Sequence, residues 1–136
     1  MFEMTSNEKT LRIMFAINLL GGGVPGAVMI LAPTWALSNM FAGTHDPAIF
    51  GMTGAIWFAI GIVSILGLFQ PNQMKSVFIL QMIYKSIWVS AVAIPLMLAG
   101  NMTVLPMAIF FVLVVLGWGY GLFGRRSEAE PAVSAA

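Results

Sequence analysis

Four long apolar stretches dominate this sequence, and they decide which solvent it can fold in. A helix needs about 20 mostly apolar residues to cross a hydrocarbon core about 30 Å thick, because each residue adds about 1.5 Å. The stretches run over residues 11–31, 48–69, 76–98 and 104–123. They are too long for the strands of a membrane barrel and lack the alternating pattern of such strands. The sequence therefore predicts an all-α, integral membrane protein.

The composition supports this interpretation. Hydrophobic residues make up 60% of the chain and charged residues only 8%, which is far from the balance of a soluble globular domain. The net charge of +1 is too weak to serve as a binding surface for nucleic acid. The chain has no cysteine, which excludes disulfides, iron–sulfur clusters and thiolate chemistry.

Helix-ending signals separate the stretches. Ala32-Pro33 ends the first stretch, Gln70-Pro71 ends the second, and residues 99–102 form a tight turn between the third and fourth. A proline is a natural boundary because the residue before it avoids helical backbone angles. Short connections make sequential helices antiparallel neighbours. We expect one four-helix, up-down-up-down bundle over residues 1–126, without an internal inverted repeat.

The basic residues predict the orientation, because membrane insertion keeps Lys and Arg on the cytoplasmic side. Apart from Lys85, they all lie at or beyond the same ends of the spans: Lys9, Arg12, Lys75, Arg125 and Arg126. The connections on the opposite side contain no Lys or Arg. Both termini are therefore expected in the cytoplasm.

The two chain ends also carry signals. The start resembles a signal peptide, because Lys9 and Arg12 precede an apolar run, but this run is longer than a typical signal core. We expect it to remain as the first span. Residues 127–136 are small, polar and acidic, and we expect a disordered cytoplasmic tail.

Lys85 is the most informative single residue, since it lies within the third stretch, roughly 13 Å from its cytoplasmic start. Insertion scales put the cost of a central lysine at about 2.5 to 3.5 kcal/mol, so such residues are functional candidates. No apolar stretch contains an acidic residue that could pair with it. Three outcomes stay open: Lys85 reaches the headgroups or makes structural hydrogen bonds, is held neutral by desolvation, or meets an anion. That anion would come from a lipid, a ligand or another subunit.

Three polar residues lie at depths comparable to that of Lys85. Gln81 precedes it by one helical turn on the same face, and Asn18 and Ser64 lie in the same cytoplasmic half. We hypothesise a polar ligand-binding pocket formed by Asn18, Ser64, Gln81 and Lys85. The alternative is interhelical hydrogen bonding, at about 0.6 kcal/mol for each bond, and for the three polar residues taken singly this alternative is favoured.

Small residues predict a kink and close helix packing. A kink or short unwound segment is expected in the first span, at Gly21, Gly22, Gly23, Pro25 and Gly26. Helix packing is expected on the second and fourth helices, at Gly51, Gly54, Gly61, Gly117 and Gly121. An interfacial aromatic belt is expected near the end of the fourth helix, at Trp118, Tyr120 and Phe123.

No catalytic or metal site can be assembled from these residues. His45 and Asp46 are too few for a zinc site, and Asp46 is better interpreted as an N-cap, with Pro47 in the first turn of the second helix. Nucleophile triads, paired carboxylates and phosphate loops cannot be recognised. The sequence therefore leaves the cofactor unknown.

The plan resembles the small bacterial four-helix membrane proteins of the DoxX-like and BphX-like families over most of the chain. The stretch 80–88, Leu-Gln-Met-Ile-Tyr-Lys-Ser-Ile-Trp, carries the resemblance most distinctly. The glycine-rich first span, Gly51-x-x-Gly54, Gly61 and Pro71 add to it. The resemblance implies an inner-membrane location and, in some members, association with oxidoreductase systems, but no catalytic residues.

Two functions follow as expectations. The first is a non-enzymatic accessory or structural subunit that contacts lipid and other membrane subunits or itself, for instance in a membrane redox or photosynthetic complex. The second is a binding or transport protein for a small apolar or anionic ligand, with Lys85 as its anchor. A membrane enzyme is the least favoured class.

Overall fold

The computed structural model describes residues 6–41 and 46–124. In these ranges the chain is helical apart from short turns, and no strand occurs. Four helical stretches are long and apolar enough to cross a membrane: Asn7–Leu31, Pro47–Phe69, Pro71–Leu98 and Met102–Phe123. The all-α class and the presence of four candidate spans are thus confirmed for the described residues.

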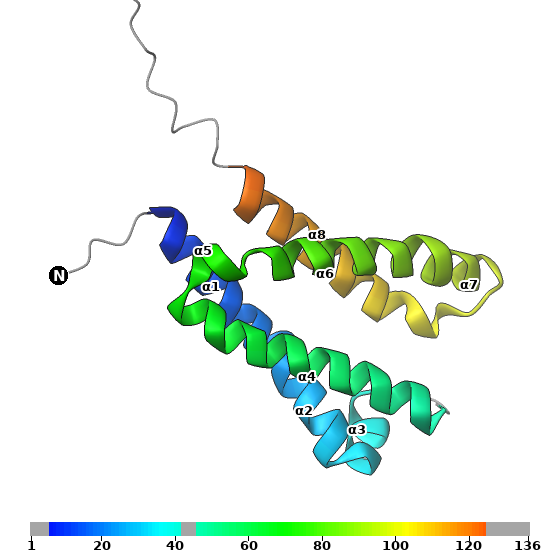
Figure 1. Cartoon of the computed structure of the whole chain (residues 1–136). Coiled ribbons are helices and arrows are strands. Elements are labelled where there is room, and N and C mark those ends of the chain that lie inside the picture. Colours follow the sequence, from blue (N-terminus) through cyan, green and yellow to red (C-terminus); the bar gives the residue numbers. More distant parts are fainter. Residues whose placement is uncertain (1–5, 42–45, 125–136) are drawn as a thin grey trace, which may run out of the picture. The chain divides into compact units, whose positions relative to one another are not determined.

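The described chain forms two compact units, the first ending at Val77 and the second starting at Phe78 (Figure 1). The first unit contains α1 (Ser6–Asn18), α2 (Val24–Leu31), α3 (Pro33–Asn39), α4 (Pro47–Phe69) and α5 (Pro71–Met74). The second contains most of α6 (Ser76–Trp88), then α7 (Ile94–Leu98) and α8 (Leu105–Phe123). A single four-helix domain over residues 1–126 stays a prediction, and the tail at 127–136 lies outside the described residues.

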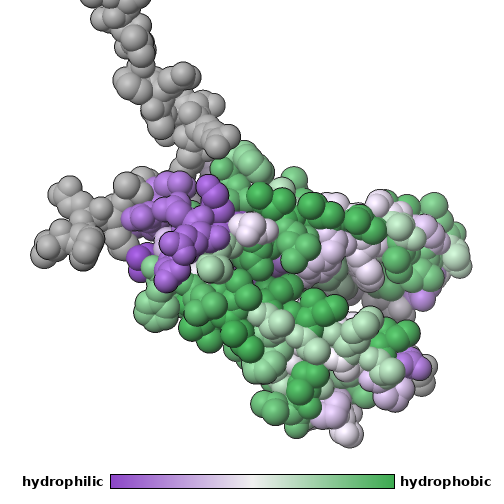
Figure 2. Space-filling view, viewed as in Figure 1, coloured by the Kyte–Doolittle hydropathy of each residue, from purple (hydrophilic) through white to green (hydrophobic). Residues whose placement is uncertain are grey.

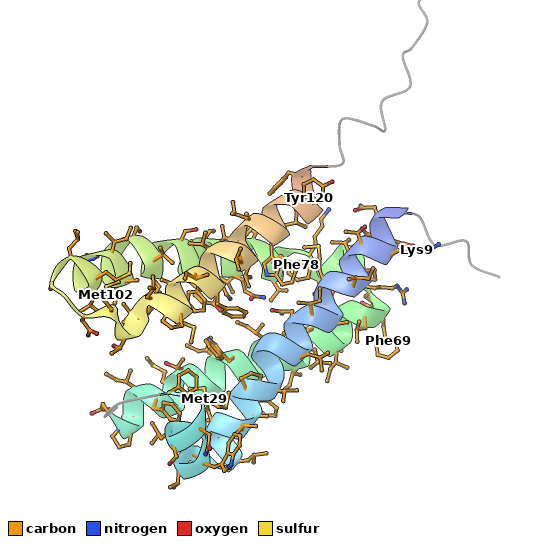
Figure 3. All side chains as sticks on the ribbon, turned by 180° about the vertical axis from the view of Figure 1, so that it is seen from behind. Lys9, Met29, Phe69, Phe78, Met102 and Tyr120 are labelled. Carbon is orange, nitrogen blue, oxygen red and sulfur yellow. The ribbon has the colours of Figure 1, made fainter. Side chains whose placement is uncertain are left out.

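In the first unit, α1 and α2 together run antiparallel to α4. Lys9, near the start of α1, lies at the same end of this unit as Phe69, the last residue of α4, whereas Met29 lies toward the other end (Figure 3). The contacts follow opposite chain directions: Phe15 with Gly67, Asn18 with Ser64, Gly23 with Gly61, and Met29 with Gly54.

Glycines allow these helices to approach to backbone contact. A Cβ atom on Gly54 would lie 2.8 Å from the Cβ of Met29, and one on Gly26 would overlap the backbone of Trp57. Gly67 receives the ring of Phe15 in the same way. The absence of a side chain at these positions therefore sets how closely the two helices pack.

A π-helical turn interrupts the first of the two long helical stretches in each unit. Leu19–Gly23 separates α1 from α2, and Val89–Ala93 separates α6 from α7. Each turn ends two residues before a proline, Pro25 or Pro95. The glycines of the expected kink fall on and just after the first turn, but the backbone there keeps helical angles at both caps and is not unwound. The second turn contains no glycine.

The connection between the first two spans is more ordered than a plain loop. It contains α3, whose Ala36 is fully buried with Met29 and Phe50 in a small apolar core. Phe41 contacts Phe50 edge to face, with ring centroids 5.6 Å apart, and so helps to hold α3 against α4.

Side-chain caps also define where two further helical segments begin. Asp46 accepts hydrogen bonds from the backbone N–H groups of Ala48 and Ile49, at 2.9 and 3.0 Å, and confirms the expected N-cap. In the second unit, Gly100 takes a positive φ of 90° at the turn, a conformation that suits glycine. Asn101 then accepts a hydrogen bond from the N–H of Thr103 and caps the next helical turn.

Polar groups gather at one end of the first unit, where α1 begins and α5 lies, while apolar residues cover much of α4 (Figure 2). Asn72 donates a hydrogen bond to Glu8 there, at 3.2 Å. Large apolar side chains are exposed on every long helix, for example Ile17, Ile56, Ile87 and Leu113.

Candidate functional site

The four residues of the hypothesised pocket form two hydrogen-bonded pairs, one in each unit. Asn18 pairs with Ser64 in the first unit, and Gln81 pairs with Lys85 in the second. All four side chains are buried, with at most 5% of their surface exposed. The convergence of both pairs on a single pocket stays a prediction.

The first pair joins two helices. Asn18 Nδ2 donates to Ser64 Oγ at 2.7 Å, and Ser64 Oγ donates in turn to the carbonyl of Ile60 at 2.7 Å. The hydroxyl thus both accepts and donates, as its chemistry allows. This arrangement is what interhelical hydrogen bonding requires, and it leaves the hydroxyl with no further proton to donate to a ligand.

The second pair lies on a hairpin of α6 and α8. The rings of Phe78 and Trp118 lie 5.0 Å apart, and those of Trp88 and Phe111 lie 5.1 Å apart. Since the residue number rises along α6 while it falls along α8, the two helices are antiparallel. Phe78 and Tyr120 accordingly lie away from Met102, which is at the connection between the two helices (Figure 3).

Lys85 is held by neutral groups. Its Nζ donates to Gln81 Oε1 at 2.8 Å and to the hydroxyl of Tyr84 at 2.6 Å. It also lies 5.1 Å from the centre of the Phe111 ring, within the range of a cation–π contact. Only 5% of the residue is exposed, and it lies near the middle of the span Pro71–Leu98.

The described part of the chain offers this ammonium no carboxylate. Residues 78–124 contain neither Asp nor Glu. The two acidic residues that the structure describes belong to the first unit: Glu8 accepts from Asn72, and Asp46 caps α4. Hydrogen bonds to neutral groups satisfy two of the three ammonium protons, but no opposite charge balances the cation within the described residues.

Two buried side-chain donors of this hairpin lack a partner. Gln81 Nε2 and Trp118 Nε1 are buried and have no hydrogen-bond acceptor among the described residues. Gln81 is 1% exposed and Trp118 is 5% exposed. A buried donor without a partner costs about 1 to 3 kcal/mol, so each such group needs an explanation.

Sequence reasoning missed three contributors to this site. Tyr84 lies in the distinctive stretch 80–88, where the sequence alone predicts no role for it. Phe111 lies in the fourth apolar stretch and carries no other signal. Trp118 was assigned to an interfacial belt, yet it is buried against Phe78, while Tyr120 remains exposed. Their roles depend on how α8 faces α6, which no local pattern in the sequence encodes.

The predicted packing glycines divide into two kinds. Gly54 and Gly61 make tight contacts inside the first unit, and Gly121 is buried. A Cβ atom on Gly51 or Gly117 would instead meet nothing within 4 Å. The last two glycines are therefore free to contact another molecule.

In the described part of the chain, no three His, Cys, Asp or Glu side chains come together as a metal site would require. His45 lies outside the described residues. Comparisons with protein families, curated proteins and solved structures found no match to this chain. The function must therefore follow from the chemistry of the residues themselves.

Proposed function

We propose that this chain is a multi-pass protein of a bacterial inner membrane, with four spans running up-down-up-down and both termini in the cytoplasm. Large apolar side chains exposed on all four long helices support a lipid environment. Lys9 and Lys75, both exposed and at helix ends, support the orientation, because basic residues stay in the cytoplasm.

Within this membrane protein, we propose a non-enzymatic binding site for a small apolar or anionic molecule, anchored by Lys85. One observation carries the proposal: a buried ammonium near the middle of a span has only neutral partners in the described residues. A charge in the bilayer interior is costly unless it is paired, and intramembrane lysines mark ligand or ion pathways by default. An anionic ligand would supply the missing opposite charge.

A second candidate is a role as an accessory or structural subunit, in contact with itself or with another membrane protein. The open surface at Gly117 on α8 favours it, because a glycine that packs against nothing lets a foreign helix approach closely. The resemblance to DoxX-like and BphX-like proteins suggests a membrane redox or photosynthetic complex as the setting.

Native mass spectrometry of the gently purified protein tests the binding proposal. We expect a co-purifying small molecule on the wild-type protein and on Lys75→Met, and its loss from Lys85→Met. Lys75 is the matched control because it is an exposed lysine near the start of the same span. An empty wild-type protein, or equal ligand content in both variants, would contradict the proposal.

The same spectra test the subunit role. We expect Gly117→Ile to remove companion subunits or to reduce the oligomer, because a branched side chain blocks a close helix contact. Leu113→Ile, which keeps the side-chain size at another exposed position of α8, serves as the control. A wild-type protein that is always monomeric and alone would contradict this second candidate.

A further inference from the structure

The contacts between α6 and α8 place Gln81 between two cross-helix contacts. Phe78 and Lys85 are related as i and i+7 on α6, and Phe111 and Trp118 are related in the same way on α8, so each pair lies on one helix face. The ring of Phe78 packs against that of Trp118 at an interplanar angle of 54°, and Lys85 lies over Phe111. Gln81, which follows Phe78 by one turn on that face, is therefore enclosed by both contacts.

We define Gln81, Lys85 and Trp118 as the donor cluster, because every unsatisfied polar atom in it is a donor. Gln81 Nε2 carries two free N–H groups, and Trp118 Nε1 carries one. The Lys85 ammonium keeps one N–H after its two hydrogen bonds. Gln81 Oε1, the acceptor of the cluster, is already engaged by Lys85.

A group that only accepts hydrogen bonds suits this cluster, and a carboxylate is such a group. It would also balance the Lys85 charge, through charge-assisted hydrogen bonds that are roughly twice as strong as neutral ones. An alcohol or an amine would bring further donors, although the one acceptor of the cluster, Gln81 Oε1, already receives a hydrogen bond from Lys85. A neutral carbonyl would accept hydrogen bonds but would leave the ammonium unbalanced.

We propose that the donor cluster binds the carboxylate of a single-chain amphiphile, of the fatty-acid class. This inference rests on the proposed function and names the class of its ligand. The rings of Phe78, Trp88 and Phe111 flank the cluster and suit an apolar chain. Lys85 lies near the middle of its span, whereas the phosphate of a bilayer phospholipid lies at headgroup depth.

Binding of matched probes to the purified full chain in mild detergent tests the class. The probes are palmitate, palmitate methyl ester, hexadecanol and decylubiquinone, of which the first three share one hydrocarbon chain. We expect palmitate to bind at least about tenfold more tightly than the other three, because only palmitate combines negative charge with acceptor oxygens. Protein-free micelles define the background uptake by the detergent, and Lys75→Met should bind palmitate like the wild-type protein.

Two substitutions target the chemistry of the cluster. Lys85→Met should lower palmitate affinity at least about tenfold, whereas Lys85→Arg should retain most of it, since the charge persists. Gln81→Glu should abolish palmitate binding, because it places a carboxylate beside Lys85 within the chain itself. Gln73→Glu, at an exposed position, is the matched control for added negative charge and should bind palmitate like the wild-type protein.

The tryptophan is tested separately, by removing its N–H and keeping an aromatic ring. Trp118→Phe should weaken palmitate binding severalfold, while Trp35→Phe, at an exposed tryptophan, should not. Unchanged palmitate affinity in Trp118→Phe would overturn the place of Trp118 in the cluster.

The possible failures can be told apart. Lys85-dependent binding of hexadecanol or decylubiquinone as tight as that of palmitate would overturn the carboxylate class and leave the proposed function standing. So would a Lys85-dependent natural ligand without a carboxylate in the native mass spectra. If the wild-type protein carries no ligand and no probe binds in a Lys85-dependent way, both proposals fail. Thermal unfolding of each variant separates lost binding from lost folding.

Discussion

Gly23 and Gly61 pack backbone against backbone: a Cβ atom on Gly23 would lie 2.6 Å from the Cα of Gly61, and one on Gly61 would lie 2.5 Å from the Cα of Gly23. Neither glycine can gain a side chain unless the two helices of the first unit separate. This contact lies between the Asn18–Ser64 hydrogen bond and the apolar core beneath α3, so it joins the two regions that hold the unit together.

Replacing Gly61 with alanine should therefore destabilise the first unit. We expect Gly61→Ala to lower the free energy of unfolding by about 1 to 3 kcal/mol, the usual cost of overpacking. Gly51→Ala, on the same helix but in open space, should be neutral or stabilising, because alanine favours a helix by about 1 kcal/mol over glycine. Unfolding in detergent would measure both, and equal effects would contradict the packing argument.

The Asn18–Ser64 hydrogen bond should contribute a modest and measurable coupling energy. In a double-mutant cycle with Asn18→Leu and Ser64→Ala, we expect a coupling of about 0.6 kcal/mol, with an upper value near 1.7 kcal/mol. Ser90→Ala is the control, because Ser90 is exposed and bonds only within its own helix. A coupling of zero would show that the pair forms no effective link between α1 and α4.

The Asp46 cap should govern the start of α4. Asp46→Ala should cost about 1 kcal/mol and should speed hydrogen exchange at the amides of Ala48 and Ile49, which lose their acceptor. Asp46→Asn keeps an acceptor oxygen and should retain most of the protection. Slow exchange at both amides in Asp46→Ala would mean that another group accepts their hydrogen bonds.

The absence of cysteine makes the orientation directly testable. In single-cysteine variants, Asn101→Cys should react with a membrane-impermeant maleimide added to cells whose outer membrane has been permeabilised. Lys75→Cys should react only after the inner membrane is opened, because the positive side stays in the cytoplasm. The reverse pattern of labelling would invert the proposed topology.

The sequence was sufficient for features that depend on length and on local chemistry. Apolar runs long enough to span a bilayer gave the number of long helices, and the Asp46-Pro47 pair gave the start of α4. The pairing of Gln81 with Lys85 also follows locally, because residues at i and i+4 share a helix face and long side chains point toward the preceding turn.

Features that depend on contacts between residues far apart in the sequence could not be predicted in this way. The aromatic pattern at the end of the fourth stretch looked like an interfacial belt, but the fold buries Trp118 and leaves Tyr120 in the open. The helix of residues 33–39 was missed because its short sequence has little periodicity, and its buried Ala36 is held by contacts with distant residues.

The π-helical turns at Leu19–Gly23 and Val89–Ala93 also set the direction in which the side chains after them point. A π-helical turn holds one more residue than an α-helical turn, so every later side chain is rotated by about 100° from the direction an unbroken helix would give it. Asn18 and Lys85 both precede such a turn. Deleting one residue from Val89–Ala93 should therefore convert the π-helical turn into an α-helical one and leave Lys85, Pro95 and the connection to α8 facing the same directions as before.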